Sequence, residues 1–191
     1  MRLLIMGPPG AGKGTQAAII GDHYGIPAIS TGNIFRLAIT QRTRLGERIK
    51  RIISEGGYVP DKLTLQVVVQ RLEEEDTKGG WLLDGFPRTV GQVKALDAEL
   101  DAHGFTLDAV ISLTADEDAI VERMLKRAEI ENRPDDNEET FRNRLEVYHQ
   151  ETDPLLEVYG ERGLLVEVDG MGSVEDVSAR ILAALAERLG H

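Results

Sequence analysis

The chain has 191 residues, of which 41% are hydrophobic and 29% charged, as in an ordinary soluble domain with one sizeable core. Its formal net charge of −11 argues against nucleic acid as a partner, because a polyanion would be repelled. The sequence has no cysteine, which excludes disulfides, thiolate metal sites and a cysteine nucleophile. No run approaches the roughly 20 apolar residues of a membrane span, and no export signal precedes the first apolar segment. We therefore expect a cytoplasmic protein without a membrane partner.

Short apolar runs alternate with longer amphipathic stretches along the chain. The apolar runs are typical of strands buried on both faces and cover residues 3–6, 28–30, 81–83, 109–113 and 164–168. The amphipathic stretches predict helices over residues 13–24, 34–55, 61–75, 90–103, 116–129, 138–159 and 174–189. This alternation predicts an α/β fold of three layers, with a five-stranded parallel sheet between helices. Two irregular segments, 56–60 and 131–137, are predicted to be surface loops or hinges.

A glycine-rich loop, GPPGAGKGT at residues 7–15, separates the first predicted strand from the first predicted helix. It has the P-loop spacing of a glycine, four residues, a glycine and a lysine. Small residues let backbone N–H groups approach a phosphate, and the following helix points the positive end of its dipole at the same place. The alternative is a solvated glycine-rich turn. The strand and helix on either side favour a P-loop NTPase fold, with triphosphate contacts from Gly10, Ala11, Gly12, Lys13, Gly14 and Thr15.

The residue after the lysine departs from the general P-loop pattern. Many P-loop proteins place a Mg²⁺-binding Ser or Thr there, whereas this chain has Gly14 and then Thr15. Mg²⁺ readily keeps several of its waters, so a carboxylate elsewhere can hold the ion through them. Asp84, which ends a predicted buried strand, is the candidate, and an ordinary Asp-Gly turn is the alternative.

The predicted strand at 81–83 is followed by the segment DGFPR. This segment lies at the carboxyl end of the strand, where ligands bind in open parallel sheets. Pro87 stiffens this turn, and Arg88 offers a planar fork suited to phosphate oxygens. Gln92 lies one helical turn later and can face the same pocket. The segment therefore predicts a second phosphate-binding site.

Several motifs together resemble the adenylate kinases of the nucleoside monophosphate kinase family, over essentially the whole chain. They are GPPGAGKGTQ, STGNIFR at 30–36, GYVPD at 57–61, DGFPRTVGQ at 84–92 and the arginines downstream. The resemblance implies reversible, Mg²⁺-dependent transfer of the terminal phosphoryl group of ATP to AMP, giving two ADP, by a monomer without zinc. It implies a P-loop core (1–29, 60–126 and 134–191) and an NMP-binding arm (30–59). The lid (127–133) is short, because five residues separate two arginines between which longer members carry a lid domain.

The resemblance also implies nucleotide contacts for individual residues. On the AMP side these are Thr31, Arg36, Gly57, Tyr58, Val59, Gly85, Phe86, Pro87, Arg88, Gln92, Arg133 and Arg144, with Gln92 on the adenine. On the ATP side they are the P-loop residues with Arg123, Arg127 and Gly172. Lys13, Arg88, Arg127, Arg133 and Arg144 would stabilise the transferring phosphoryl group, which needs positioning and charge more than covalent chemistry. Asn33 stands where the family often has Asp, which bears on the acceptor loop.

Other interpretations share parts of this pattern. A UMP/CMP kinase has the same short lid and DGFPR segment, although Thr31 and the TVGQ run favour adenine. A nucleotide-binding switch or scaffold needs a P-loop, but it has no need for the downstream arginines. Acidic residues crowd the region of those arginines, so a salt-bridged helical surface is the alternative interpretation of that region. A P-loop GTPase is disfavoured because the chain has no Asn-Lys-x-Asp motif.

Overall fold

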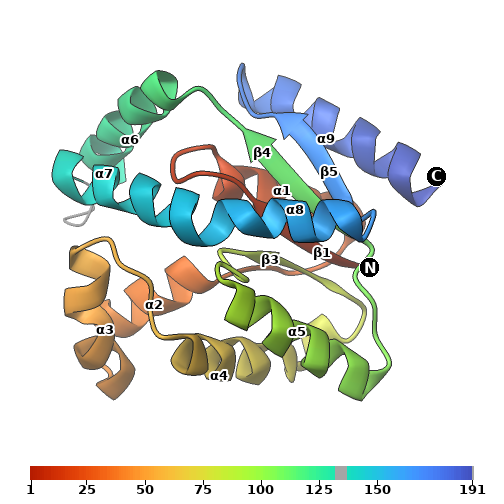
Figure 1. The fold of residues 1–191 in the computed structure, drawn as a ribbon, viewed down its shortest axis with the longest axis horizontal. Coiled ribbons are helices and arrows are strands. Elements are labelled where there is room, and N and C mark those ends of the chain that lie inside the picture. Colours follow the sequence, from red (N-terminus) through yellow and green to blue (C-terminus); the bar gives the residue numbers. More distant parts are fainter. Residues whose placement is uncertain (132–136, 191) are drawn as a thin grey trace.

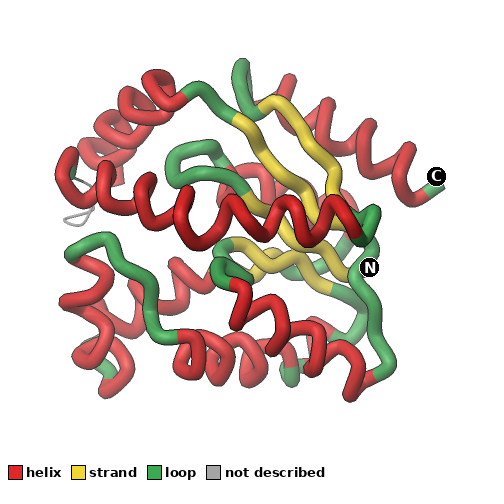
Figure 2. Tube along the Cα trace, viewed as in Figure 1, coloured by secondary structure: helices red, strands yellow, loops and turns green. Residues whose placement is uncertain are grey.

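The centre of the fold is a parallel sheet of five strands (Figures 1 and 2). The computed structural model describes residues 1–131 and 137–190, and side chains for 1–126 and 137–190. The strands are β1 (Arg2–Met6), β2 (Ala28–Ser30), β3 (Trp81–Asp84), β4 (Ala109–Thr114) and β5 (Leu165–Asp169), in the order β2-β3-β1-β4-β5. Each neighbouring pair is parallel. The predicted sheet is confirmed, and each strand ends within one residue of its predicted bounds.

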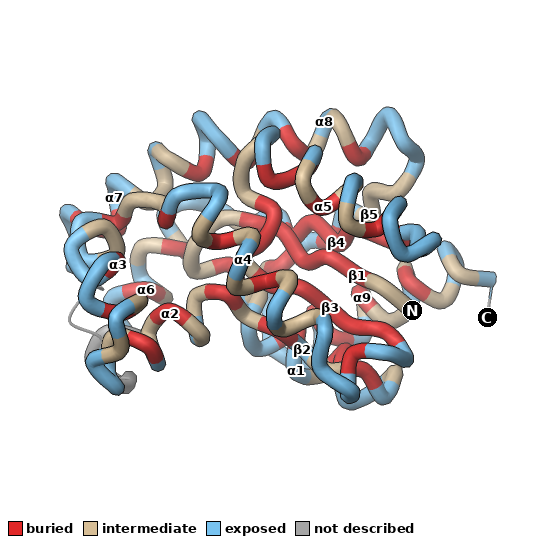
Figure 3. Tube along the Cα trace, turned by 90° about the horizontal axis from the view of Figure 1, so that it is seen from below, coloured by how far each residue is buried: buried red, intermediate tan, exposed pale blue. Residues whose placement is uncertain are grey.

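Helices cover both faces of the sheet, and the alternation of side chains along β1 explains why. Leu3 and Ile5 of β1 pack on one face, under α1 (Lys13–Tyr24) and α9 (Val174–Leu189). Leu4 and Met6 pack on the other face, under α5 (Val90–His103) and α8 (Asp153–Glu161). The central strands are accordingly buried along their length (Figure 3). Three layers result, as the sequence predicts.

The segment after β2 forms two helices, although the sequence predicts one over 34–55. They are α2 (Thr31–Thr40) and α3 (Arg44–Ser54), and Arg42 between them has a φ of 52°. The Thr43 hydroxyl caps α3 by accepting a hydrogen bond from the Gly46 N–H at 3.0 Å. A Cβ at Gly46 would lie 2.1 Å from the Ala38 carbonyl oxygen, so the helices meet at their backbones. Both helices share the amphipathic period, so the period alone does not reveal the turn.

The predicted helix over 138–159 is likewise interrupted. It consists of α7 (Glu138–Val147), a π-helical turn η2 (Tyr148–Thr152) and then α8. The remaining helices are α4 (Asp61–Leu72), a short 3-10 turn η1 (Glu75–Thr77) and α6 (Glu117–Glu131). Within the described residues, no helix combines the length and apolar character needed to cross a membrane.

Two small hydrophobic clusters lie outside the main core. One cluster, of Phe35, Ile49 and Val59, holds α2 and α3 together with the chain that leads to α4. The other, of Ile120, Met124 and Phe141, joins α6 to α7. The α2–α3 segment and the α6–α7 pair therefore each have a small hydrophobic core, separate from the core of the sheet.

Candidate active site

A cleft of about 540 Å³ lies at the carboxyl ends of the strands, where the P-loop, the arm and the DGFPR loop meet. The strand order reverses at β1, which has β3 on one side and β4 on the other. Such a switch point leaves a crevice beside the loop that follows the strand. The cleft wall accordingly includes Gly7 after β1, Ser30 at the end of β2 and Asp84 at the end of β3.

The P-loop backbone takes conformations that side chains disfavour. Gly7, Gly10 and Gly12 have φ angles of 142°, 87° and 91°. A Cβ at Gly7 would lie 2.6 Å from the Leu113 carbonyl oxygen, so a glycine is needed where the loop crosses β4. Among the described residues, no side chain caps the N-terminus of α1. The loop therefore presents the uncapped end of a helix to the cleft, which suits an anion.

Lys13 begins α1 and lines the cleft. Its ammonium group donates hydrogen bonds to the backbone oxygens of Gly7 and Pro8, at 2.8 and 2.9 Å. These bonds fold the side chain over the loop that it follows. The positive charge is thereby held at the mouth of the P-loop, beside the N-terminus of the helix.

Asp84 lines the cleft at the end of β3, and its side chain lies beside α1. A Cβ at Gly14 would be 3.7 Å from the Asp84 Oδ2 atom, so the carboxylate occupies the neighbourhood where other P-loop proteins have a hydroxyl ligand. Among the described residues, no group of three or more His, Cys, Asp or Glu side chains is placed to hold a metal. A lone carboxylate beside a phosphate loop fits Mg²⁺, which commonly combines one or two carboxylates, substrate phosphates and water.

The loop after β3 fixes Arg88 through several contacts. Its Nε donates to the Gly85 carbonyl oxygen at 2.8 Å, and its guanidinium carbon lies 5.0 Å from the centre of the Tyr58 ring. The same Gly85 oxygen accepts from the Thr31 hydroxyl at 2.9 Å. A Cβ at Gly85 would lie 2.8 Å from both the Arg88 Nη2 and the Thr31 Oγ1, so only glycine lets the three groups converge. The guanidinium group remains at the cleft wall.

The π-helical turn places two more side chains in the cleft wall, Tyr148 and Thr152. The Thr152 hydroxyl donates to the Arg88 carbonyl oxygen at 2.9 Å and lies 2.8 Å from the Tyr58 hydroxyl. Burial raises the pKa of the Tyr148 hydroxyl, with Asp153 adding to the increase, so this group stays protonated at neutral pH.

The Gln92 carboxamide has one hydrogen-bond partner at each end. Its Oε1 accepts from the Arg88 N–H at 2.8 Å, and its Nε2 donates to Asp61 Oδ1 at 2.8 Å. Thr89, the N-cap of α5, donates to Asp61 Oδ2 at 2.9 Å. Gln92 lines the cleft and is almost fully buried.

The arm presents a cation, Arg36, from the middle of α2. The Arg36 Nη2 donates to Asn33 Oδ1 at 2.8 Å, and both residues line the cleft. Arg144 reaches the cleft from α7, across from the arm, where a Cβ at Gly56 would lie 3.1 Å from the Arg144 Cγ. Arginines from four separate parts of the chain therefore border one cleft together with Lys13, namely Arg36, Arg88, Arg123 and Arg144.

Comparisons with known proteins agree with this geometry. The family model described as adenylate kinase matches residues 5–164. A protein of Leifsonia xyli subsp. xyli named adenylate kinase is 60% identical over 97% of this chain and 94% of its own length. The adenylate kinase of Clavibacter michiganensis subsp. michiganensis is 57% identical over 98% and 94%, and that of Bifidobacterium longum is 50% identical over 97% and 100%. The chain belongs to the adenylate kinase family. It is a nucleoside monophosphate kinase, a transferase, and the reaction of the family is ATP:AMP phosphotransfer.

Most residues that the family resemblance singles out meet in this cleft. Those that line it are Gly10, Gly12, Lys13, Gly14, Thr15, Thr31, Arg36, Gly57, Tyr58, Val59, Asp84, Gly85, Pro87, Arg88, Gln92, Arg123 and Arg144. The cleft wall does not include Ala11, Phe86 or Gly172. Phe86 is 1% exposed and packs in the core under α5. Arg133 and the side chain of Arg127 lie outside the described residues.

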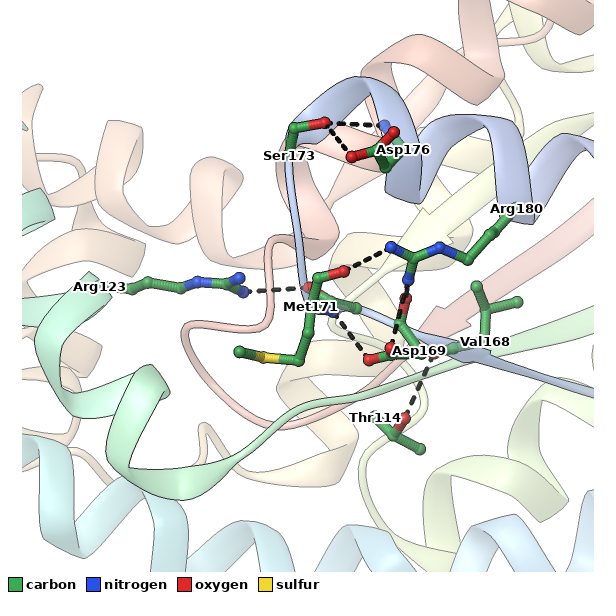
Figure 4. Close-up of polar contacts among 9 residues, drawn as sticks. Thr114, Arg123, Val168, Asp169, Met171, Ser173, Asp176 and Arg180 are labelled. Atoms are coloured by element: carbon green, nitrogen blue, oxygen red, sulfur yellow. Dashed lines mark hydrogen bonds and ion pairs between the residues drawn. The ribbon is translucent and has the colours of Figure 1, made fainter.

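The loop after β5 contacts Arg123 of α6, a residue that lines the cleft (Figure 4). The Arg123 Nη1 donates to the Gly170 carbonyl oxygen at 3.1 Å. On the far side of the loop, Arg180 of α9 donates to the backbone oxygens of Asp169 and Met171. Ser173 caps α9 by accepting from the Asp176 N–H at 3.1 Å. The loop that contains Gly172 is therefore held by Arg123 of α6 on one side and by Arg180 of α9 on the other.

Sequence reasoning missed several residues of the cleft wall, among them Tyr148, Thr152 and Met124. Tyr148 and Thr152 are four residues apart, which in a regular helix puts them on one face. That signal was present in the sequence, but the π-helical turn that directs both to the cleft leaves no mark in the hydrophobic period.

Proposed function

We propose that ATP and AMP lie end to end in this cleft, and that the P-loop holds the donor while the DGFPR loop and the arm hold the acceptor. The observation that carries the proposal is that one cleft contains both Lys13 of the P-loop and Arg88 of the second phosphate site. A protein that only stores ATP has no use for the second set of cations. End-to-end binding brings two polyanions together, and cations on both sides offset their repulsion.

On the donor side, we propose that backbone N–H groups at residues 10–15 and the Lys13 ammonium hold the ATP phosphates. The uncapped N-terminus of α1 and the glycine conformations support this role. Asp84 would hold Mg²⁺ through water, beside Gly14. When bound, Mg²⁺ neutralises charge on the donor phosphates. Arg123 would lie against the donor adenine, and the backbone near Gly172 would contact the same base.

On the acceptor side, we propose that Arg36 and Arg88 hold the AMP phosphate and that Gln92 hydrogen-bonds the adenine. Thr31, residues 57–59 and the 85–87 turn would complete the pocket. The position of Gly85, which lets Arg88 and Thr31 share one carbonyl oxygen, supports a rigid acceptor loop. Phe86 would contribute through its backbone, because its side chain is in the core.

Transfer itself would depend on positioning and on charge, with no general base required. The acceptor phosphate is already an anion, so its oxygen attacks without losing a proton. Lys13, Arg88 and Arg144 would surround the transferring group, together with Arg127 and Arg133 by resemblance to the family.

We propose further that residues 30–59 act as an NMP-binding arm and 127–133 as a short lid, on a core of 1–29, 60–126 and 134–191. The separate cluster of Phe35, Ile49 and Val59 supports an arm that moves as a unit. The Thr140 hydroxyl donates to the Ser54 carbonyl oxygen at 3.2 Å, which supports contact between arm and α7 on closure. Hydrogen exchange with and without a two-headed nucleotide inhibitor tests this. Increased protection in both 30–59 and 127–133 is expected, and unchanged protection contradicts it.

The choice of acceptor is tested with ATP and a panel of AMP, CMP, UMP and GMP. We expect the highest kcat/KM with AMP and loss of transfer when EDTA removes Mg²⁺. A higher kcat/KM with a pyrimidine acceptor contradicts the adenine assignment.

We also propose that the enzyme acts as a monomer on free nucleotides in the cytoplasm. Each predicted nucleotide contact comes from a single chain, so the cleft does not require a second copy. Light scattering at working enzyme concentration checks this, and a dimer mass contradicts it.

A further inference from the structure

We propose that Asp61 is a specificity-determining positioning residue, which fixes the orientation of the Gln92 carboxamide and thereby the hydrogen-bonding pattern offered to the acceptor base. This inference rests on the proposed contact between Gln92 and the base. Asp61 begins α4 and does not line the cleft. It lies behind Gln92, so its effect on the nucleotide is indirect.

The carboxamide of a glutamine can turn over, but the partners of Gln92 allow one orientation. A carboxylate only accepts hydrogen bonds, and a backbone N–H only donates. The Nε2 must therefore face Asp61 Oδ1, at 2.8 Å, and the Oε1 must face the Arg88 N–H, also at 2.8 Å. Turning the group over would bring two acceptors together at Asp61 and two donors together at Arg88, and each clash would leave polar groups unpaired in a buried place.

Each end of the carboxamide keeps one hydrogen-bonding position after these contacts. The Nε2 has a second hydrogen, and the Oε1 has a second lone pair. Adenine presents an acceptor at N1 next to a donor at its 6-amino group, which matches one donor and one acceptor in fixed order. Hypoxanthine presents the reverse order, a donor at N1 and an acceptor at O6. An amide locked in one orientation therefore separates AMP from inosine monophosphate, IMP, although the two bases have nearly the same shape.

Asp61 is itself held in place by the elements that meet there. Its second oxygen accepts from Thr89, whose hydroxyl also caps α5 by accepting from the Gln92 N–H at 3.2 Å. A Cβ at Gly91 would lie 2.6 Å from the Asp61 Oδ2, so glycine makes room for the carboxylate. The charge also lies in the first turn of α4, where the helix dipole favours an anion.

The test measures the ratio of kcat/KM for AMP to kcat/KM for IMP, with ATP as donor. A ratio taken on one enzyme preparation does not depend on the fraction of folded enzyme. Asp61→Ala and Asp61→Leu both remove the acceptor, so the test does not depend on the folding of a single variant. Asp61→Asn can still turn its oxygen to Gln92. Glu175→Gln is the matched control, because it removes a first-turn carboxylate from α9, away from the cleft.

We expect the ratio to fall about tenfold in Asp61→Ala and Asp61→Leu, corresponding to about 1.4 kcal/mol. Asp61→Asn should restore most of the ratio, and Glu175→Gln should leave it unchanged. A merely structural role for Asp61 would lower both rates together and leave the ratio intact, which would overturn the proposal. Gln92→Ala separates the two levels of the account. If it lowers the ratio while the Asp61 variants do not, the base contact stands and the role of Asp61 is wrong. If it has no effect on the ratio, the base contact itself is wrong.

Discussion

The Thr152 hydroxyl donates a hydrogen bond to the backbone oxygen of Arg88, at 2.9 Å. A hydroxyl has a single hydrogen, so the Tyr58 hydroxyl must donate to Thr152, at 2.8 Å. The Tyr58 ring lies under the guanidinium group of Arg88. The π-helical turn, the arm and the phosphate loop are therefore joined at a threonine that is 4% exposed.

Thr152→Val should lower the free energy of unfolding and weaken the binding of AMP. The change leaves the Arg88 carbonyl and the Tyr58 hydroxyl without their partner, at a cost of about 1–3 kcal/mol. For a chain of this size, each kcal/mol lowers the unfolding midpoint by about 2–4 °C. Thermal unfolding and the KM for AMP check this. Thr152→Ser keeps the hydroxyl and is the matched control, so equal behaviour of the two variants would show that the hydroxyl is irrelevant.

Arg88→Ala should lower kcat/KM for AMP by about 10²–10³, the loss expected when a preorganised donor to developing charge is removed. The unfolding midpoint should change little, because the guanidinium group lies at the cleft wall. Arg142→Ala is the control, since Arg142 forms an exposed ion pair with Glu138 on α7. Steady-state kinetics of both variants give the answer. An Arg88→Ala enzyme with full activity would exclude the second phosphate site.

Gly7→Ala should destabilise the protein more than Gly25→Ala. Both glycines have positive φ, so an alanine at either position is strained, at a cost of roughly 1–3 kcal/mol. At Gly7 the new Cβ also meets the Leu113 carbonyl oxygen at 2.6 Å, whereas at Gly25 it meets nothing within 4 Å. Chemical denaturation measures the two losses. Equal losses would mean that β4 shifts freely and that the loop is not held against it.

His149 should make stability depend on pH. Its Nδ1 lies 2.6 Å from Asp153 Oδ2 and its Nε2 lies 3.0 Å from Glu117 Oε1, which joins α8 to α6. The hydrogen bond to Asp153, followed by the contacts with Glu117, raises the pKa of His149 above its ordinary 6.5. A raised pKa stabilises the folded state fully below pH 6.5, and the contribution disappears as pH rises through the higher value.

The comparison of wild type with His149→Gln therefore depends on pH. Thermal unfolding at pH 5.5 and 8.5 should show a larger difference between the two proteins at pH 5.5. High salt should reduce this difference, because the cluster is exposed. A difference that is larger at pH 8.5 has the wrong sign and would contradict the assignment.

The sequence predicts the sheet and the phosphate loop well, because each depends on a local pattern. The strand from Leu3 to Met6 is buried on both faces of the sheet, and the unbroken apolar run in the sequence indicates this burial. The helix from Lys13 to Tyr24 has its predicted bounds. The break at Arg42 depends on the contact of Gly46 with Ala38, and the turn at Thr152 depends on partners far away in the chain. Asp61 could not be connected to Gln92 from sequence, because only the packing of α4 on α5 brings them together.

The most direct test of the account is a crystal structure with a two-headed nucleotide analogue, in which two adenosines are joined by a chain of phosphates. The account predicts that one molecule spans the cleft, with its phosphates between Lys13 on one side and Arg88 and Arg144 on the other. If those three side chains instead point into bulk solvent, or if the two adenosines occupy separate surface sites, the shared cleft is wrong.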